Sequence, residues 1–279
     1  MQDVFAYCAE LVRTADRDRY LATLFAPSQD RGALFALYAF DGELARVRDA
    51  AREPLPGEIR LQWWSEVLSG ERDGEAGANP VASALLQTIA RHRLDAAALI
   101  DVIEARRFDL YDEPVQTLAD LEDYAKRTSS ALLALTAKIL SGADVKEAAE
   151  PAGIAYGIAA LLRAFARHAS RGQPYVPLEL LARHEVQTSD VFAGQSSPGL
   201  NAALDELRTI ARNHLATASR RLLELPADAL PAFLPVAPVG PLLRRLDRRD
   251  AFSPVDIPPW RRQWLIWRAA RDPARIARA

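Results

Sequence analysis

Hydrophobic residues recur every three or four positions along most of the chain, with polar residues between them. This spacing places apolar side chains on one face of a helix, whereas a strand needs strict alternation, which is absent. The pattern therefore predicts an all-α protein. The clearest stripes are Leu34, Leu37, Phe40, Leu44, Val47; Val81, Leu85, Ile89; Leu99, Val102, Ile103, Arg106, Leu110; Leu121, Tyr124, Thr128, Leu132, Leu135, Ile139; Ile154, Ile158, Leu161, Leu162, Phe165; and Leu204, Leu207, Ile210, Leu215, Leu222.

Turn-forming residues interrupt these stripes at short segments, namely 54–57, 69–80, 141–142, 171–177 and 195–199. None of these segments is long enough to be a linker between domains, and the chain has no internal repeat. We therefore predict a single helical domain over residues 1–279. The exception is the proline-rich stretch 226–259, where we expect only short helical pieces because proline breaks helices.

Composition narrows the class of protein further. Hydrophobic residues make up 49% of the 279 residues, and the net charge of −2 argues against a nucleic-acid partner. Cys8 is the only cysteine, so no intrachain disulfide is expected and a reducing compartment is indicated. No run of 18 apolar residues is present, and Asp3, Glu10, Asp16 and Asp18 do not fit a targeting peptide. The sequence predicts a cytoplasmic protein and leaves open peripheral contact with the inner membrane.

The C-terminal segment 260–279 combines tryptophan with arginine. Trp260, Trp264 and Trp267 fall at i, i+4 and i+7, which is one stripe of a helix. Arginines occupy much of the remainder, and Asp272 is the only acid. Such a basic amphipathic helix could lie on an anionic membrane or on a partner protein. Alternatively, the tryptophans pack onto the domain and the arginines face solvent.

Three segments carry more specific motifs. The first is Leu37-Tyr38-Ala39-Phe40, followed by a helix over 43–49, and the second is Arg60-Leu61-Gln62-Trp63-Trp64-Ser65-Glu66. The third spans 157–177 and ends in Arg171-Gly172-Gln173-Pro174-Tyr175-Val176-Pro177. In order and spacing these segments resemble the squalene/phytoene synthase family. The resemblance implies an isoprenoid synthase fold, with helices around a central apolar cavity. Tyr38, Trp63, Trp64 and Tyr175 are its fold-marking residues, although a tryptophan pair alone indicates no more than core packing.

Enzymes of this family condense two prenyl diphosphates head to head, and they ionise an allylic diphosphate to do so. The resemblance implies two aspartate-rich helices that hold magnesium, which prefers carboxylate and water oxygens as ligands. At the positions where the family has the aspartates of its first motif (the first motif register), this chain has Ala45, Arg46 and Asp49. At the positions of the second motif (the second motif register), it has Ala164 and His168. Only Asp49 keeps its carboxylate. We therefore predict no metal site and no confident catalytic residue, and we expect the two alanines to fill helix contacts.

The replacements suggest a different chemistry. Arg46, Arg163, Arg167 and Arg171, with His168, stand where the family holds diphosphate, and guanidinium groups bind phosphate without metal. Arginines three or four positions apart would lie on one helix face, and these residues are candidates for an anion or diphosphate site. The alternative is a solvated basic face. For the acids Asp101, Glu104, Asp109 and Asp112, a polar helix face is the favoured interpretation.

Within the family, the chain is most similar to the aspartate-depleted subgroup that includes the mitochondrial complex I assembly factor. The shared segments include Glu43-Leu44-Ala45, 121–124, Ser129-Ser130 and 231–234. The resemblance implies a non-catalytic protein that acts in assembly of respiratory NADH dehydrogenase, with complex I subunits or assembly proteins as partners, or a scaffold that binds an isoprenoid lipid. The alternative is a prenyltransferase with a rearranged metal site anchored by Asp49. No cofactor is expected, and magnesium only if that enzyme alternative holds.

Overall fold

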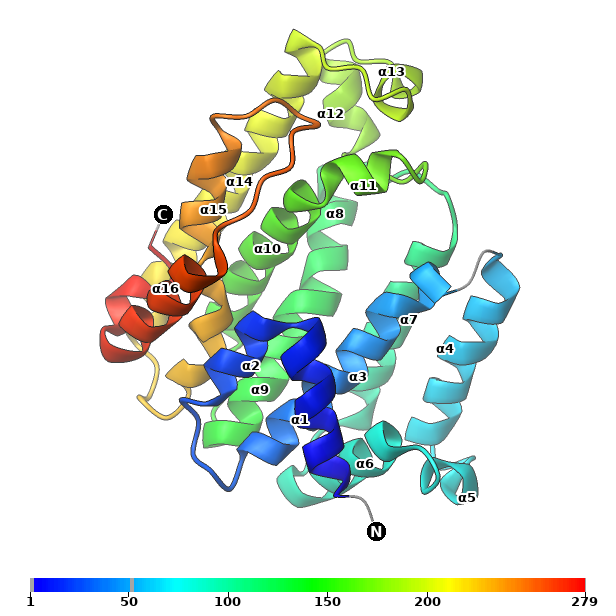
Figure 1. Cartoon of the computed structure of the whole chain (residues 1–279), viewed down its shortest axis with the longest axis vertical. Coiled ribbons are helices and arrows are strands. Elements are labelled where there is room, and N and C mark those ends of the chain that lie inside the picture. The colour runs from blue at the N-terminus through cyan, green and yellow to red at the C-terminus, as the bar shows by residue number, and fades with distance from the viewer. Residues whose placement is uncertain (1–2, 51–52, 279) are drawn as a thin grey trace. The chain divides into compact units, whose positions relative to one another are not determined.

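The computed structural model describes residues 3–50 and 53–278, and within these residues it contains helices and no strand (Figure 1). The all-α prediction is confirmed. The chain divides into two compact units whose segments alternate along the sequence, so the single domain stays a prediction. Unit 1 comprises Met1–Tyr111, Ala131–Val145 and Leu225–Pro235; unit 2 comprises Asp112–Ser130, Lys146–Glu224 and Val236–Ala279.

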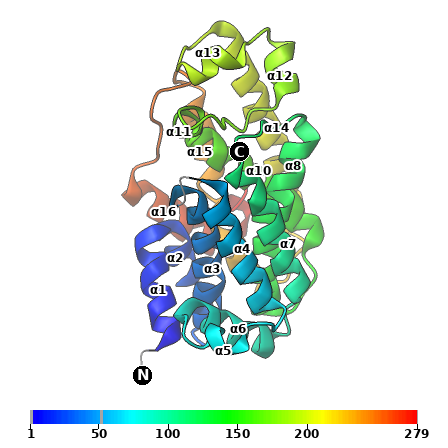
Figure 2. The same cartoon turned by 90° about the vertical axis from the view of Figure 1, so that its right-hand side faces the viewer.

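The helices of unit 1 are mostly long and amphipathic. They are α1 (Val4–Ala15), α2 (Arg17–Thr23), α3 (Arg31–Ala50), α4 (Pro54–Leu68), α5 (Asp73–Ala76), α6 (Pro80–His92), α7 (Ala96–Arg107), η1 (Phe108–Leu110) and α9 (Ala131–Ser141), and most of η3 (Leu230–Val236) also belongs here. Helix α3 packs against α1 and α6, and α1 runs beside α3 in both views (Figures 1 and 2). The predicted stripe of α3 is its buried face, from Leu34 to Val47.

Unit 2 is built around two neighbouring helices, α10 (Lys146–Arg163) and α14 (Pro198–Leu222), which pack along each other (Figure 1). The other elements of the unit are α8 (Leu118–Ala125), η2 (Lys126–Ser130), α11 (Phe165–Ala169), α12 (Leu178–Arg183), α13 (Thr188–Phe192), α15 (Val239–Leu246), α16 (Pro259–Arg271) and η4 (Pro273–Arg275). Gly153 of α10 lets η2 approach closely, because a Cβ at this position would clash with the backbone of Ser130.

Two predicted helices differ from the observed ones. The stripe from Leu121 to Ile139 is not one α-helix, since a π-helical turn, η2, separates α8 from α9. The predicted C-terminal helix ends early, at Arg271, because Asp272 is extended before Pro273. Its last predicted residue, Ala279, lies outside the described residues. The proline-rich stretch forms short pieces as predicted, including α15.

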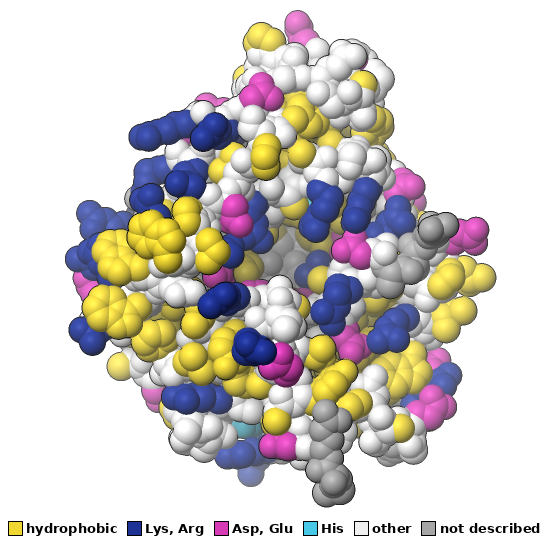
Figure 3. All heavy atoms as spheres, in the orientation of Figure 1, with side chains coloured by type: hydrophobic (Ala, Val, Ile, Leu, Met, Phe, Trp, Pro, Cys, Tyr) yellow, Lys and Arg dark blue, Asp and Glu magenta, His cyan; other side chains and the backbone are white. Residues whose placement is uncertain are grey.

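The tryptophans of α16 do not pack onto the domain. Trp260, Trp264 and Trp267 are 70%, 45% and 43% exposed, whereas Ile266 and Ala269 are the buried residues of the helix. Apolar side chains therefore stand on the surface over α16, among arginines (Figure 3). The packing alternative is wrong for this helix. Among the described helices, none has the length and hydrophobicity needed to cross a bilayer.

Candidate functional site

A carboxylate lies inside the apolar face of α3. Asp41 follows Leu37 by four positions and precedes Leu44 by three, so helix geometry points it inward with them, and it is only 3% exposed. A buried carboxylate is costly unless cations and hydrogen bonds compensate it. An acid on the apolar face of α3 was a signal in the sequence that could have indicated this site. That signal does not identify the residues that pair with the acid.

The partners of Asp41 are two arginines from other helices of unit 1. Arg19 of α2 donates from Nη1 to Asp41 Oδ2 at 2.5 Å, and Arg106 of α7 donates from Nη2 to Oδ1 at 3.2 Å. Arg106 also donates to Asp109 at 3.3 Å. All four side chains are largely buried. Asp109 therefore belongs to a buried ion-pair network, and its assignment to a polar helix face was wrong.

The charges of this network fix the ionisation state of Asp41. Burial by itself would raise the pKa of its carboxyl group, but the guanidinium groups of Arg19 and Arg106 outweigh burial and hold the pKa below its ordinary value. Asp41 is consequently an anion near neutral pH. Both of its oxygens are engaged by arginine, so the carboxylate acts as a tie between α2, α3 and α7.

Tyr38 adds a polar group to the same region. The Arg19 guanidinium carbon lies 5.0 Å from the centre of the Tyr38 ring, and Thr136 of α9 donates to the phenol oxygen at 3.3 Å. Burial is the main reason why the pKa of Tyr38 is raised above its ordinary value. Tyr38 therefore stays a neutral phenol that packs against the charged network.

A pocket of about 420 Å³ opens beside this network within unit 1. Helix α1 contributes an apolar wall, and Asp16 lies between α1 and α2. Helix α2 contributes Arg19, and α3 contributes residues between Tyr38 and Arg46. Asp16 is also the cap of α2, since its side chain accepts from the Arg19 backbone N–H at 3.0 Å. The pocket thus has an apolar side and a charged side on which acidic and basic groups neutralise each other. Its lining also includes Arg46, which is exposed. Sequence reasoning identified Arg46 but missed Arg19 and Arg106.

The residues in the register of the first aspartate motif lie at the surface of unit 1. Ala45, Arg46 and Asp49 are all exposed on α3. Ala45 lines the pocket, so within unit 1 it does not fill a contact between helices, and that expectation was wrong.

Trp64 of α4 is fully buried and meets Phe40 of α3 edge to face, with ring centres 5.0 Å apart. The core-packing interpretation is confirmed for this tryptophan, whereas its neighbour Trp63 is partly exposed.

The residues in the register of the second motif lie in unit 2, where the helix is interrupted. Helix α10 ends at Arg163, Ala164 leaves helical geometry, and α11 begins at Phe165. Arg163 and Arg167 are exposed on either side of this break. Arg171, also exposed, follows the end of α11, so the three arginines do not share one continuous helix face as the spacing had indicated.

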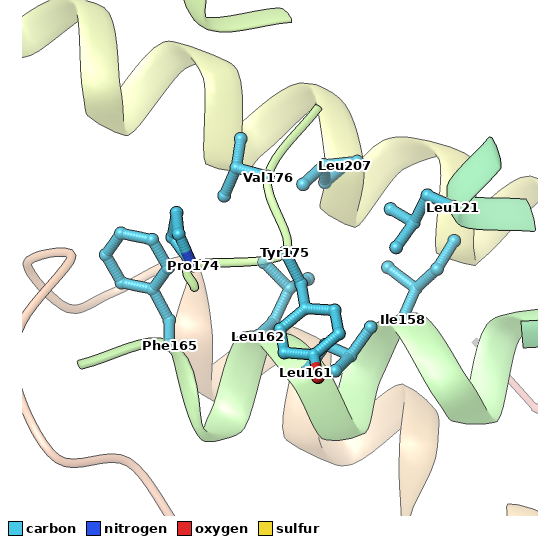
Figure 4. Close-up of a pocket in the computed structure, with 9 residues that line it drawn as sticks. All are labelled: Leu121, Ile158, Leu161, Leu162, Phe165, Pro174, Tyr175, Val176 and Leu207. Carbon is cyan, nitrogen blue, oxygen red and sulfur yellow. The ribbon is translucent and has the colours of Figure 1, made fainter. Parts of the chain in front are cut away.

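His168 and Tyr175 pack against each other in this part of unit 2. Their ring centres are 4.9 Å apart, and Tyr175 takes a left-handed backbone with φ of 56°. The neighbouring cavity has a volume of about 10 Å³ and is lined by nine residues without charge, including Tyr175 (Figure 4). A cavity of this size is too small for a ligand beyond a single water molecule. His168 is thus placed as a packing residue beside an apolar core.

Magnesium is the ion that the family resemblance implies. The two motif registers retain a single carboxylate, Asp49, among five positions, and both oxygens of Asp41 are already taken by arginine. Within residues 3–50 and 53–278, no three His, Cys, Asp or Glu side chains are grouped so that they could hold a metal ion. Magnesium needs several oxygen ligands, so this donor set does not fit a magnesium cluster.

Comparison with known proteins defines the class of this chain. A model of the squalene/phytoene synthase family matches residues 12–268. The chain therefore belongs to the squalene/phytoene synthase family, as its motifs predicted. A dehydrosqualene synthase structure with a bound ligand superposes with a TM-score of 0.83 at 20% identity, covering 96% of this chain and 95% of the other. A squalene synthase of Alicyclobacillus acidocaldarius gives 0.75 at 21% identity, covering 90% and 95%. These likenesses establish the fold.

Within the family, the chain is similar to proteins of two kinds. Complex I assembly factor 6 of Rattus norvegicus is 32% identical over 250 residues, which are 89% of this chain and 75% of that protein. The protein of the same name from Homo sapiens is 32% identical over 246 residues, covering 88% and 74%. The 15-cis-phytoene synthase of Synechococcus elongatus is 25% identical over 243 residues, covering 82% and 79%.

Proposed function

We propose that this chain acts in the assembly of respiratory NADH dehydrogenase and does not condense prenyl diphosphates. The observation that carries the proposal is the 32% identity to complex I assembly factor 6 over 89% of the chain, against 25% to a phytoene synthase. Because one fold can host many activities, the fold likeness to synthases does not weigh against this role.

The candidate site supports the non-catalytic half of the proposal. Ionisation of an allylic diphosphate needs cations that neutralise the leaving group, and magnesium does so only when carboxylates hold it. The first motif register of this chain keeps Asp49 alone, and Asp41 is bound by Arg19 and Arg106. Of the acids next to the first motif register, the buried Asp41 is thus engaged by the chain's own arginines, which supports the proposal.

The pocket of unit 1 favours a second candidate role, as a scaffold that binds an isoprenoid lipid. Its volume of about 420 Å³ lies in the range of small-molecule sites. Leu11, Val12 and Ala15 give it an apolar wall that suits a hydrocarbon tail, while Arg46 suits an anionic head group. Binding of this kind is compatible with an assembly role and requires no metal.

Deletion of the gene for this chain tests the proposal directly. NADH-driven quinone reduction should fall in membranes of the deletion strain, while carotenoid, hopanoid and squalene levels stay unchanged. Complementation with the wild-type chain should restore quinone reduction. The variant Asp49→Asn should restore it equally well, because the proposal gives this exposed carboxylate no metal to hold.

The enzyme alternative makes the opposite forecast in the same strains. If Asp49 anchors a rearranged metal site, deletion removes a prenyl product and Asp49→Asn does not bring it back. Normal quinone reduction together with a missing prenyl product would overturn the proposal in favour of a prenyltransferase.

A further inference from the structure

The C-terminal part of the chain differs in charge from everything before it. Residues 236–279 contain ten arginines and four aspartates with no lysine or glutamate, a net charge of +6. Because the whole chain carries −2, residues 1–235 carry −8. Such a separation of charge along the sequence orients a protein toward an anionic surface.

The two faces of α16 have opposite roles. At 100° per residue, Trp260, Trp264 and Trp267 lie within about 60° of one another, on the side opposite Ile266 and Ala269. The isoleucine and the alanine are buried, whereas the three tryptophans are the exposed ones. Helix α16 therefore buries one face and presents a tryptophan face to the surroundings (Figure 3).

Arginines frame the tryptophan face. The guanidinium carbon of Arg268 lies 4.3 Å from the ring centre of Trp264, and that of Arg271 lies 4.1 Å from the ring centre of Trp267. Among the residues that the structure describes, no carboxylate forms an ion pair with Arg268, Arg271 or Arg261. Stacking of this kind uses the faces of the guanidinium groups and leaves their N–H edges able to donate to an anion.

Further arginines of unit 2 extend this positive region beyond α16. Burial lowers the pKa of Arg244 on α15, and the charges of Arg261, Arg278 and Arg212 lower it further against the opposing effect of Asp247. Asp247 itself forms ion pairs with Arg208 and Arg212. Because arginines outnumber acids in residues 236–279, an anionic surface is attracted to this region.

We propose that the tryptophan face of α16 lies flat on an anionic lipid bilayer, with the indole rings at the headgroup boundary and the flanking arginines on lipid phosphates. Tryptophan is enriched at this boundary because its ring is amphipathic, and arginine is attracted by anionic headgroups. The centre of a protein–protein interface is usually depleted of charge. Here arginines stack directly on the exposed rings, an arrangement that suits phosphates better than a protein groove.

Vesicle co-sedimentation of the full chain tests this proposal. The chain should sediment with vesicles of phosphatidylcholine containing about 30 mol % phosphatidylglycerol, and much less with pure phosphatidylcholine. Added salt should weaken the binding to anionic vesicles. The tryptophan fluorescence should shift to the blue on binding, because Trp64 is buried and the three rings of α16 are exposed in the free protein.

Two variants locate the binding to α16. The combined change Trp260→Ala, Trp264→Ala and Trp267→Ala, and separately Arg268→Gln with Arg271→Gln, should each lower the partition coefficient on the order of tenfold. Matched controls on other helices of unit 2 are Phe192→Ala, an exposed aromatic, and Arg220→Gln with Arg221→Gln, which should bind like the wild type. Circular dichroism checks that each variant is folded.

The outcomes separate the proposal from its rivals. Equal sedimentation of the wild type and both α16 variants would overturn it, as would equal binding to neutral and anionic vesicles. A wild-type chain that stays in the supernatant with both kinds of vesicle would also overturn it and would leave α16 as a face for a protein partner. The proposed assembly role does not depend on the result, since the deletion strain tests that role separately.

Discussion

Helix α3 of unit 1 and the α10–α11 segment of unit 2 carry the two predicted motif registers, and they differ in how their charged side chains are placed. On α3 the register residues Ala45, Arg46 and Asp49 are exposed, whereas Asp41, one turn before Ala45, is fixed in the core between Arg19 and Arg106. On α10–α11 the replacements are exposed arginines on either side of a helix break. The Asp41 network is buried and closed by its own ion pairs, whereas the arginines of α10–α11 are exposed to solvent and Arg163 lies 3.9 Å from Asp256.

This difference separates two roles of charged side chains. Buried ion pairs hold helices in place, so their removal should be measured as lost stability. Exposed cations contribute little to stability but are accessible to anions. Charged side chains are therefore structural in the core of unit 1 and accessible to anions on the surface of unit 2.

The largest expected effect is that of Asp41→Ala. This change leaves Arg19 and Arg106 buried without their shared carboxylate, and loss of one partner of a buried ion pair costs about 3–5 kcal/mol. Urea unfolding followed by circular dichroism measures the loss. Replacement of the whole network by apolar residues, Arg19→Met, Asp41→Leu, Arg106→Met and Asp109→Leu, should be much less harmful. The control Glu10→Gln, in an exposed pair with Arg13, should leave the unfolding midpoint unchanged.

The pH dependence of stability follows from the same network. Because the pKa of Asp41 is lowered in the folded state, its contribution is fully present above its ordinary value of 3.8. The contribution is lost as the pH falls below 3.8 and through the depressed pKa of the folded protein. Wild-type stability should therefore fall more steeply with acid than that of the variant with all four network residues replaced by apolar ones. Parallel curves for the two proteins would show that Asp41 is not the anion that ties these helices.

A pair of glycine substitutions compares the packing of the two helices. Gly153→Ala on α10 should destabilise the protein by about 1–3 kcal/mol, because the new methyl group meets the Ser130 backbone, which cannot rotate away. Gly42→Ala on α3 meets nothing within 4 Å and should stabilise by up to about 1 kcal/mol through helix propensity. Thermal unfolding of both variants measures these changes in stability. A tolerated Gly153→Ala would mean that η2 and α10 are not in close contact.

The smallest effect is expected for the exposed arginines of unit 2. Arg163→Ala with Arg167→Ala should leave the unfolding midpoint unchanged and weaken binding of inorganic diphosphate by about fivefold for each charge removed. Calorimetry at two salt concentrations, with and without magnesium, measures this. Binding should weaken with salt and not require the metal. If the double variant binds inorganic diphosphate as tightly as the control variant Arg220→Ala with Arg221→Ala does, Arg163 and Arg167 are only part of a solvated basic face.

The sequence was sufficient for the all-α class, the family and the buried stripe of α3, because helical periodicity and the motif spacing are local patterns. It did not predict the arginine partners of Asp41, since Arg19 and Arg106 are 22 and 65 positions away and only the folded chain brings them together. It also missed the helix break at Ala164 and the early end of α16. Spacing alone indicated one arginine face on α10–α11, and the break divides it.

The central claim is that this member of the family folds as a synthase does but does not ionise prenyl diphosphates. The most direct measurement incubates the purified full chain with farnesyl or geranylgeranyl diphosphate and magnesium, and quantifies released diphosphate and head-to-head product. The squalene synthase of Alicyclobacillus acidocaldarius, whose fold this chain shares, serves as the positive control. We predict no magnesium-dependent release above the background without protein. Catalytic release of diphosphate, abolished by Asp49→Asn, would contradict the account.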